Sequence, residues 1–321
     1  MRRLRVSPTP YRRIALAAVV LLAIIVVTGA SVRLTGSGLG CPDWPNCSPG
    51  RLTPESASDS HAMIEFVNRT VTGLVSLVVI VAVLGSLVRT PRSRRLVILS
   101  LGLVAGVIVQ IILGKLVVEE LLSPTFVMAH FLVSMVLLAN AVLLYYYASQ
   151  PPTDPVVSVS PGVHWMSRLL VLSGAVVLVT GTVVTGAGPH SGDVPGISQR
   201  ATRLDIAVRD AARIHGTSAM ILLALTLVTA WLVWRTRAPQ RVQHRLSILL
   251  VVLVAQGAIG YAQYFSGIPP LLVALHVAGA TSVWIAVMWF ALGVYERPAL
   301  DELKDHRAPR PALVATADVP Q

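Results

Sequence analysis

Long uninterrupted runs of apolar residues dominate this chain, in place of the period of two or of 3.6 residues that marks half-buried strands and amphipathic helices. A helix needs about 20 consecutive apolar residues to cross a bilayer. Eight runs are long enough: Ile14–Val32, Ile64–Val88, Leu96–Val118, Thr125–Tyr147, Trp165–Ala187, Ala211–Trp234, Leu246–Phe265 and Leu271–Tyr295. The pattern therefore predicts an all-α polytopic membrane protein with eight transmembrane helices.

A Pro- and Ser-rich segment, SQPPTDPVVSVSPG from Ser149 to Gly162, divides these eight runs into four and four. Such a composition is typical of a linker. We therefore expect an amino-terminal four-helix bundle over residues 1–148, a cytoplasmic linker over 149–164, a carboxy-terminal four-helix bundle over 165–297 and a cytoplasmic tail over 298–321.

The two halves contain an internal repeat. Three pairs of residues recur at a constant offset of 146 positions: Gln110 with Gln256, Gly114 with Gly260, and His130 with His276. Looser matches align VVTGASVRLTGSG with LVTGTVVTGAGPHSG and IEFVNRT with AARIHGT, and the second of these sets Asn68 opposite His215. The same order of helices in both halves predicts two tandem, pseudo-symmetric four-helix bundles related by an axis along the membrane normal.

Composition and charge agree with a membrane protein. Only 13% of the residues are charged, about half the share of a typical soluble domain. The net charge of +11 comes from Arg and Lys residues clustered at the amino terminus, in alternate loops and in the carboxy-terminal tail. This positive-inside distribution predicts that both termini are cytoplasmic, and it argues against a nucleic-acid partner.

Two histidines in the second half are candidates for ligands of a haem iron. His215 and His276 lie one or two turns inside helices that enter from the same outer side, and small residues such as Gly216 and Gly279 follow each of them. A flat macrocycle between two helices needs a ligand on either side and little bulk beside it. The alternative is that each histidine is a buried polar group bonded to a neighbouring helix.

The corresponding site in the first half differs, because its histidine, His130, lies opposite Asn68 instead of a second histidine. An amide is a poor iron ligand, so this half is expected to hold a haem by one axial histidine and to leave the other face open for chemistry. His61, two turns before Asn68, is a candidate replacement ligand if its helix begins early. If the helix begins later, His61 belongs to the loop before it.

Glu65 lies three residues before Asn68, on the same helix face. A carboxylate there could move a proton or stabilise positive charge on a substrate. The alternative is a structural carboxylate paired with Arg69, His61 or Lys115. Arg33, Arg69, Lys115 and Arg213, near the outer ends of their helices, could bind haem propionates or lipid headgroups equally well.

Cys41 and Cys47 are the two cysteines of the chain, and both lie in the first outer loop. On the oxidising side of a membrane, this short spacing predicts a disulfide bond. The bond either staples the loop over the first bundle or takes part in redox chemistry. In the helix of Gln110, Gly102, Gly106 and Gly114 are spaced as a packing stripe of small residues.

Taken together, RLTGSGLGCPDWPNC, IEFVNR, TGAGPHSGD and the two Gln-to-His repeats resemble the haem A synthase family, over nearly the whole chain. The resemblance implies a bacterial plasma-membrane or mitochondrial inner-membrane enzyme that oxidises the C8 methyl group of haem O to a formyl group, making haem A for cytochrome oxidase. It implies a haem b cofactor between His215 and His276, substrate haem next to His130, and Glu65 as the catalytic carboxylate. It also implies contact with haem O synthase and cytochrome c oxidase assembly factors, beside membrane lipid, and leaves a homo-oligomer open.

The chain departs from the family pattern at one position. The pattern has histidine in E-x-x-H-R, whereas this sequence has EFVNR with Asn68. Two rival functions remain. A dihaem b-type electron carrier would leave haem unaltered, and two bis-histidine sites are disfavoured by Asn68. A haem transporter or chaperone is compatible with the tandem bundles alone.

Overall fold

The computed structural model describes residues 5–41, 44–190, 192 and 202–297, which form eight long helices and one short pair of strands. Every helix is long and apolar enough to cross a membrane, which confirms the prediction of an all-α polytopic membrane protein. The helices are α1 (Pro8–Leu34), α2 (Ser60–Val88), α3 (Arg94–Glu119), α4 (Pro124–Ala148), α5 (Pro161–Ala187), α6 (Val208–Arg235), α7 (Gln240–Phe265) and α8 (Pro270–Gly293). The strands β1 (Val156–Val157) and β2 (Tyr295–Glu296) pair antiparallel.

Local sequence signals explain where several helices begin. Proline has no amide hydrogen to leave unpaired in the first turn, and four helices start with it, at Pro8, Pro124, Pro161 and Pro270. Asp59 caps α2, because its side chain accepts a hydrogen bond of 3.0 Å from the amide of Ala62. His61 therefore lies in the first turn of α2, and the end of the segment that we expected to be a linker is the first turn of α5.

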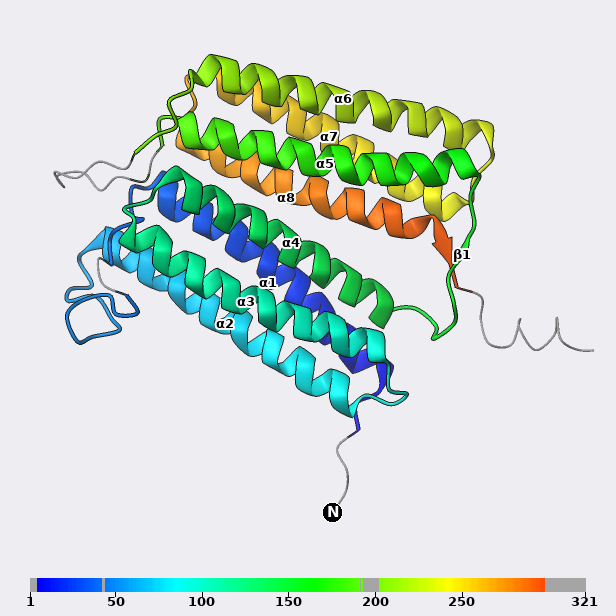
Figure 1. The fold of residues 1–321 in the computed structure, drawn as a ribbon, viewed down its shortest axis with the longest axis horizontal. Helices are drawn as coiled ribbons and strands as arrows, with labels where there is room; N and C mark the ends of the chain where they lie inside the picture. Colours follow the sequence, from blue (N-terminus) through cyan, green and yellow to red (C-terminus); the bar gives the residue numbers. More distant parts are fainter. Residues whose placement is uncertain (1–4, 42–43, 191, 193–201, 298–321) are drawn as a thin grey trace, which may run out of the picture.

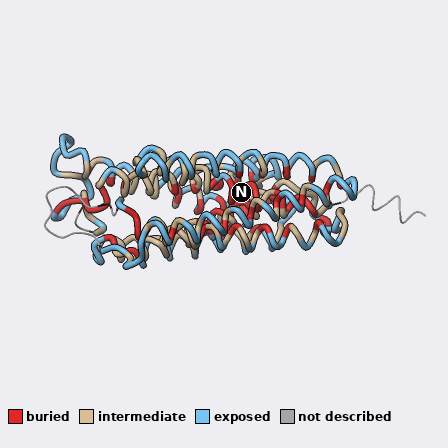
Figure 2. The backbone as a smooth tube through the Cα atoms, turned by 90° about the horizontal axis from the view of Figure 1, so that it is seen from above, coloured by how far each residue is buried: buried red, intermediate tan, exposed pale blue. Residues whose placement is uncertain are grey.

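The helices pack as two groups (Figure 1). Within α1–α4, and again within α5–α8, each helix contacts its neighbours in a closed ring, and the two groups meet through α1, α4, α5 and α8. Buried positions lie along the inner faces between the helices (Figure 2). The start of α1 and the end of α8 lie at the same end of the molecule (Figure 1), and we call the opposite end, with Cys41 and Cys47, the disulfide end.

The backbone repeats between the α3–α4 and α7–α8 hairpins. After α3 the amide of Leu122 donates to the carbonyl of Val117 at 2.8 Å, and after α7 the amide of Ile268 donates to Gln263 at 2.9 Å. Leu122 and Ile268 share a φ of 61°. These pairs keep the offset of the Gln-to-His repeat. The pseudo-symmetry of the two complete groups stays a prediction.

A tryptophan joins the two groups near the middle of the molecule. The indole of Trp284 on α8 donates a hydrogen bond of 3.0 Å to the backbone carbonyl of Met135 on α4, and the ring packs on Gly174 of α5. Farther from the disulfide end, Trp289 stacks on Tyr145 with ring centroids 5.9 Å apart. These contacts hold α4 against α8, and each of these two helices carries a candidate histidine.

Candidate functional site

His215 on α6 and His276 on α8 face each other across the second helix group. Their ring centroids are 6.2 Å apart and their planes are inclined by 79°. A glycine of a neighbouring helix lies against each ring. A Cβ atom at Gly181 would lie 3.1 Å from Cε1 of His215, and one at Gly260 would lie 2.9 Å from Cε1 of His276. An added Cβ would therefore displace the imidazole at Gly260, and at Gly181 it would fit only if the imidazole moved slightly.

Neighbouring polar side chains orient both rings through the Nδ1 atom. The hydroxyl of Thr180 lies 3.2 Å from Nδ1 of His215 and 2.9 Å from the hydroxyl of Ser218. The amide nitrogen of Gln256 lies 3.0 Å from Nδ1 of His276 and donates to the carbonyl of the same residue at 2.9 Å. Histidines that bind metals commonly donate a hydrogen bond from one ring nitrogen and leave the other for the metal. The hydroxyl of Thr180 can accept such a bond from His215, whereas the amide nitrogen of Gln256 is placed as a donor at His276.

The spacing of the two rings fits a shared metal atom. Bonds from a metal to imidazole nitrogen are about 2.0–2.1 Å, as measured for zinc, so two imidazoles on one metal have centroids about 6 Å apart. Among the described residues no group of three or more His, Cys, Asp or Glu side chains could hold a metal ion by itself. Haem iron needs only two axial ligands, because the macrocycle supplies the others.

His130 on α4 occupies the corresponding place in the first helix group. Gln110 donates to its backbone carbonyl at 3.0 Å and to the hydroxyl of Ser134 at 2.6 Å, which repeats the bond from Gln256 to the carbonyl of His276. A Cβ atom at Gly114 would lie 3.7 Å from Cε1 of His130, an ordinary contact. The Nδ1 atom of His130 is buried and has no hydrogen-bond partner among the described residues.

Asn68 occupies the position that the repeat sets opposite His130, where the second group has His215. Its Oδ1 atom is buried and has no hydrogen-bond partner in the described part of the chain. At Gly29, which matches Gly181 in the repeat, no described atom would lie within 4 Å of an added Cβ atom. The first group thus combines an orphaned amide oxygen with local room, whereas the second group is filled by an imidazole.

Glu65 is held by the disulfide loop. The residue is 5% exposed. Its Oε1 accepts two hydrogen bonds from Arg69, at 2.5 and 3.1 Å, and its Oε2 accepts one of 2.9 Å from the amide of Cys41. Arg69 in turn donates to the carbonyls of Asn46 and Cys41 at 2.8 and 3.1 Å. The predicted disulfide between Cys41 and Cys47 is present, so it closes the loop whose backbone holds the Glu65–Arg69 pair.

The remaining candidates lie at or near the disulfide end. Nδ1 of His61 is 3.1 Å from the hydroxyl of Ser37. Arg33 donates to the carbonyl of Thr185 at 3.1 Å, which links α1 to α5. The exposed cations form ion pairs within their own helices, Lys115 with Glu119 and Arg213 with Asp210.

Two positions at the paired histidines were not among the sequence candidates: Thr180 and Gly181. A signal was present, because the Thr-Gly pair recurs as Thr28 and Gly29 in the matching helix. Its importance follows only from the contacts with His215.

A pair of oriented imidazoles between two of eight apolar helices is typical of the class of membrane proteins that bind haem in helical bundles. The model of the cytochrome oxidase assembly protein family, COX15-CtaA, matches residues 12–196 and 211–319. The chain therefore belongs to this family.

Curated relatives carry one common name. A haem A synthase of Listeria monocytogenes serovar 1/2a is 26% identical over 294 residues, which cover 86% of this chain and 91% of that protein. A haem A synthase of Lysinibacillus sphaericus is 32% identical over 135 residues, 40% of this chain and 42% of that protein. One of Exiguobacterium sibiricum is 32% identical over 124 residues, 38% of this chain and 41% of that protein.

Proposed function

We propose that this protein is a haem A synthase, a membrane-bound oxidoreductase that oxidises the C8 methyl group of haem O to a formyl group. The family and the shared name of its relatives support the reaction. The observation that carries the proposal is the difference between two repeat-related sites. One has two facing imidazoles. In the other, the repeat sets Asn68 opposite His130, and the Oδ1 atom of Asn68 has no hydrogen-bond partner among the described residues. A closed site suits electron transfer, and an open one suits a substrate.

In this proposal haem b binds between His215 and His276 and supplies one-electron transfer. Thr180 holds the ring of His215 through Nδ1. A metal-bound Nε2 requires a proton on Nδ1, which the hydroxyl of Thr180 can accept from His215. The carboxamide of Gln256 is the polar partner at Nδ1 of His276. The residues present therefore fit a bis-histidine haem.

The substrate haem O binds at His130 in this proposal. Asn68 lies on the opposite side, and its orphaned Oδ1 offers a hydrogen-bond acceptor at the open face. Glu65 is the catalytic carboxylate, which stabilises positive charge as the methyl group is oxidised. Arg69 and the amide of Cys41 fix the position of the carboxylate through the three hydrogen bonds to its oxygens. His61 remains the weaker candidate for a haem ligand, because it lies two turns from Asn68, in the first turn of α2.

We further propose a plasma-membrane location with both termini in the cytoplasm. Arg12 and Arg13 in the first turns of α1, and the Arg-rich segments between α2 and α3 and between α6 and α7, lie at the same end of the molecule as the end of α8 (Figure 1). This distribution agrees with the positive-inside rule. The disulfide end then faces the oxidising side. Handover of haem O from its synthase and delivery of haem A to the oxidase would take place in this membrane.

The test is the identity of the haem that membranes contain. Membranes from a host that makes haem O but no haem A are compared with and without this protein, by haem extraction, chromatography and mass detection. Haem A or its hydroxylated precursor is expected only with the protein. Unchanged haem O under aerobic conditions with an intact electron supply, together with bound haem b, would favour an electron carrier instead.

A further inference from the structure

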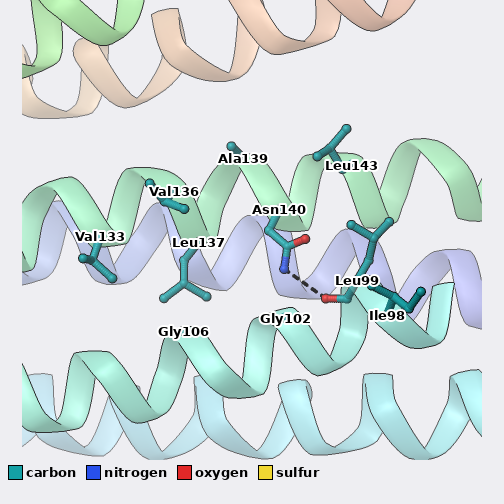
Figure 3. Close-up of a pocket in the computed structure, with 10 residues that line it drawn as sticks. All are labelled: Ile98, Leu99, Gly102, Gly106, Val133, Val136, Leu137, Ala139, Asn140 and Leu143. Carbon is teal, nitrogen blue, oxygen red and sulfur yellow. Dashed lines mark hydrogen bonds between the residues drawn. The ribbon is translucent and has the colours of Figure 1, made fainter. Parts of the chain in front are cut away.

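A groove of about 460 Å³ runs along the outer surface between α3 and α4 (Figure 3). On α4 it extends from Val133 to Leu143, which corresponds to about 15 Å of helix. Its walls are almost entirely apolar. The amide nitrogen of Asn140 is turned to the carbonyl of Leu99, to which it donates at 2.9 Å. The groove therefore suits a hydrocarbon chain.

The groove begins about one turn of α4 from His130 and is built by α3 and α4, the two helices that carry Gly114 and His130. Val133 follows His130 by one turn of α4, and on α3 Gly106 lies two turns from Gly114, which contacts His130. The glycines Gly102 and Gly106 form the floor, because α3 and α4 approach so closely there that an added Cβ would lie 2.9 Å from the amide of Asn140 or 2.6 Å from Leu137. A chain attached to a macrocycle at His130 could continue into the groove along the helices.

The second helix group has a different surface at the matching place. At the offset of the repeat, Ile248 and Val252 on α7 replace the two glycines of α3. Val252 packs on the core of the second group. On α8 the side chain becomes smaller, since Ser282 replaces Val136 of α4. The glycine floor therefore belongs only to the half in which the substrate is proposed to bind.

This difference matches the chemistry of the two haems. Haem O carries a hydroxyethylfarnesyl chain that haem b lacks, and an extended farnesyl chain is about as long as the groove. We propose that the groove between α3 and α4 binds the farnesyl chain of haem O, an inference that rests on the proposed function. The chain marks one edge of the nearly symmetric macrocycle, so holding it would determine which methyl group faces the catalytic residues.

A substitution at the rim tests the proposal. Val136 lines the groove and is 67% exposed, so Val136→Phe narrows the groove without disturbing the core. Val109→Phe is the matched control, because Val109 is an exposed residue of α3 that does not line the groove. Each variant is purified with haem b bound, reconstituted in phosphatidylcholine nanodiscs, and titrated by absorbance with haem O and with haem b, which has no farnesyl chain.

We expect Val136→Phe to weaken binding of haem O about fivefold to tenfold, as overpacking of a fitted groove does, while binding of added haem b and the Val109→Phe control stay unchanged. Equal affinity of Val136→Phe and wild type for haem O would overturn the proposal. This also applies if the variant has lost a membrane lipid from the groove, because the groove would then bind lipid and not the farnesyl chain. Equal weakening for both haems would also overturn it, since the ring site would then be damaged. If wild type neither binds nor converts haem O, the proposed function itself fails.

Discussion

Gly260→Ala is expected to impair haem b binding, because it places a methyl group against a proposed axial ligand. The new Cβ would lie 2.9 Å from Cε1 of His276, whereas carbon atoms attract best at about 3.5–4.0 Å. The imidazole must therefore move by at least about 0.6 Å, away from the position in which Gln256 holds it at 3.0 Å. Gly114→Ala in the first helix group is the matched control, since its Cβ would lie 3.7 Å from Cε1 of His130.

Without haem the imidazole can move aside, whereas haem binding requires it in its present place. The overpacking cost of about 1–3 kcal/mol therefore falls on the bound state and corresponds to a loss of haem affinity of about fivefold to 150-fold. Alanine also improves helix propensity by up to about 1 kcal/mol over glycine. This gain in helix stability is the same with and without haem, so it does not change the affinity for haem b.

The assay is the ratio of haem b to protein after purification, followed by titration of the haem-depleted protein with haem b and by the optical spectrum of the bound haem. Gly260→Ala should show a lower ratio and weaker binding, with Gly114→Ala close to wild type. Stoichiometric haem b with wild-type affinity and spectrum in Gly260→Ala would refute the assignment of His276 as a ligand confined by Gly260.

Three other predictions concern charged groups. Glu65→Gln should abolish conversion of haem O while haem b content stays normal, and retained conversion would remove Glu65 from the chemistry. Arg69→Met leaves a buried carboxylate without its cation, so the free energy of unfolding should fall by about 3–5 kcal/mol, with part of the loss recovered in the double variant with Glu65→Gln; additive losses would contradict the pairing. The hydrogen bond from Arg241 holds the pKa of Glu296 below its usual range, so this contact stabilises the protein above the ordinary glutamate pKa of about 4.3 and is lost as pH falls through the lowered pKa of the folded state. Both side chains are more than a third exposed, so Glu296→Gln should lower the free energy of unfolding at pH 7 by less than about 1 kcal/mol. Thermal unfolding of wild type and variant is compared at pH 7 and well below pH 4. The difference between the two proteins should disappear at the lower pH.

The sequence alone determined the membrane architecture and the repeated positions. In lipid the backbone must satisfy its own hydrogen bonds, so each long apolar run has to form a helix, and all eight predicted helices are present. The spacing from Gln110 to His130 and from Gln256 to His276 also predicted equivalent positions, and the bonds from each glutamine to the backbone of its histidine agree with this. Such features depend on composition and spacing along one or two helices, which the sequence states directly.

Only the tertiary structure decided which partners the polar groups choose. For Glu65 the sequence left Arg69, His61 and Lys115 open, and the structure pairs it with Arg69 and the amide of Cys41. That choice depends on how the disulfide loop folds back over α2, which no periodicity encodes. The unpartnered Oδ1 atom of Asn68 and the groove beside Gly106 likewise arise from the distance between helices. Helix formation in a membrane is decided by local apolarity, whereas side-chain contacts are decided by close packing between segments far apart in the chain.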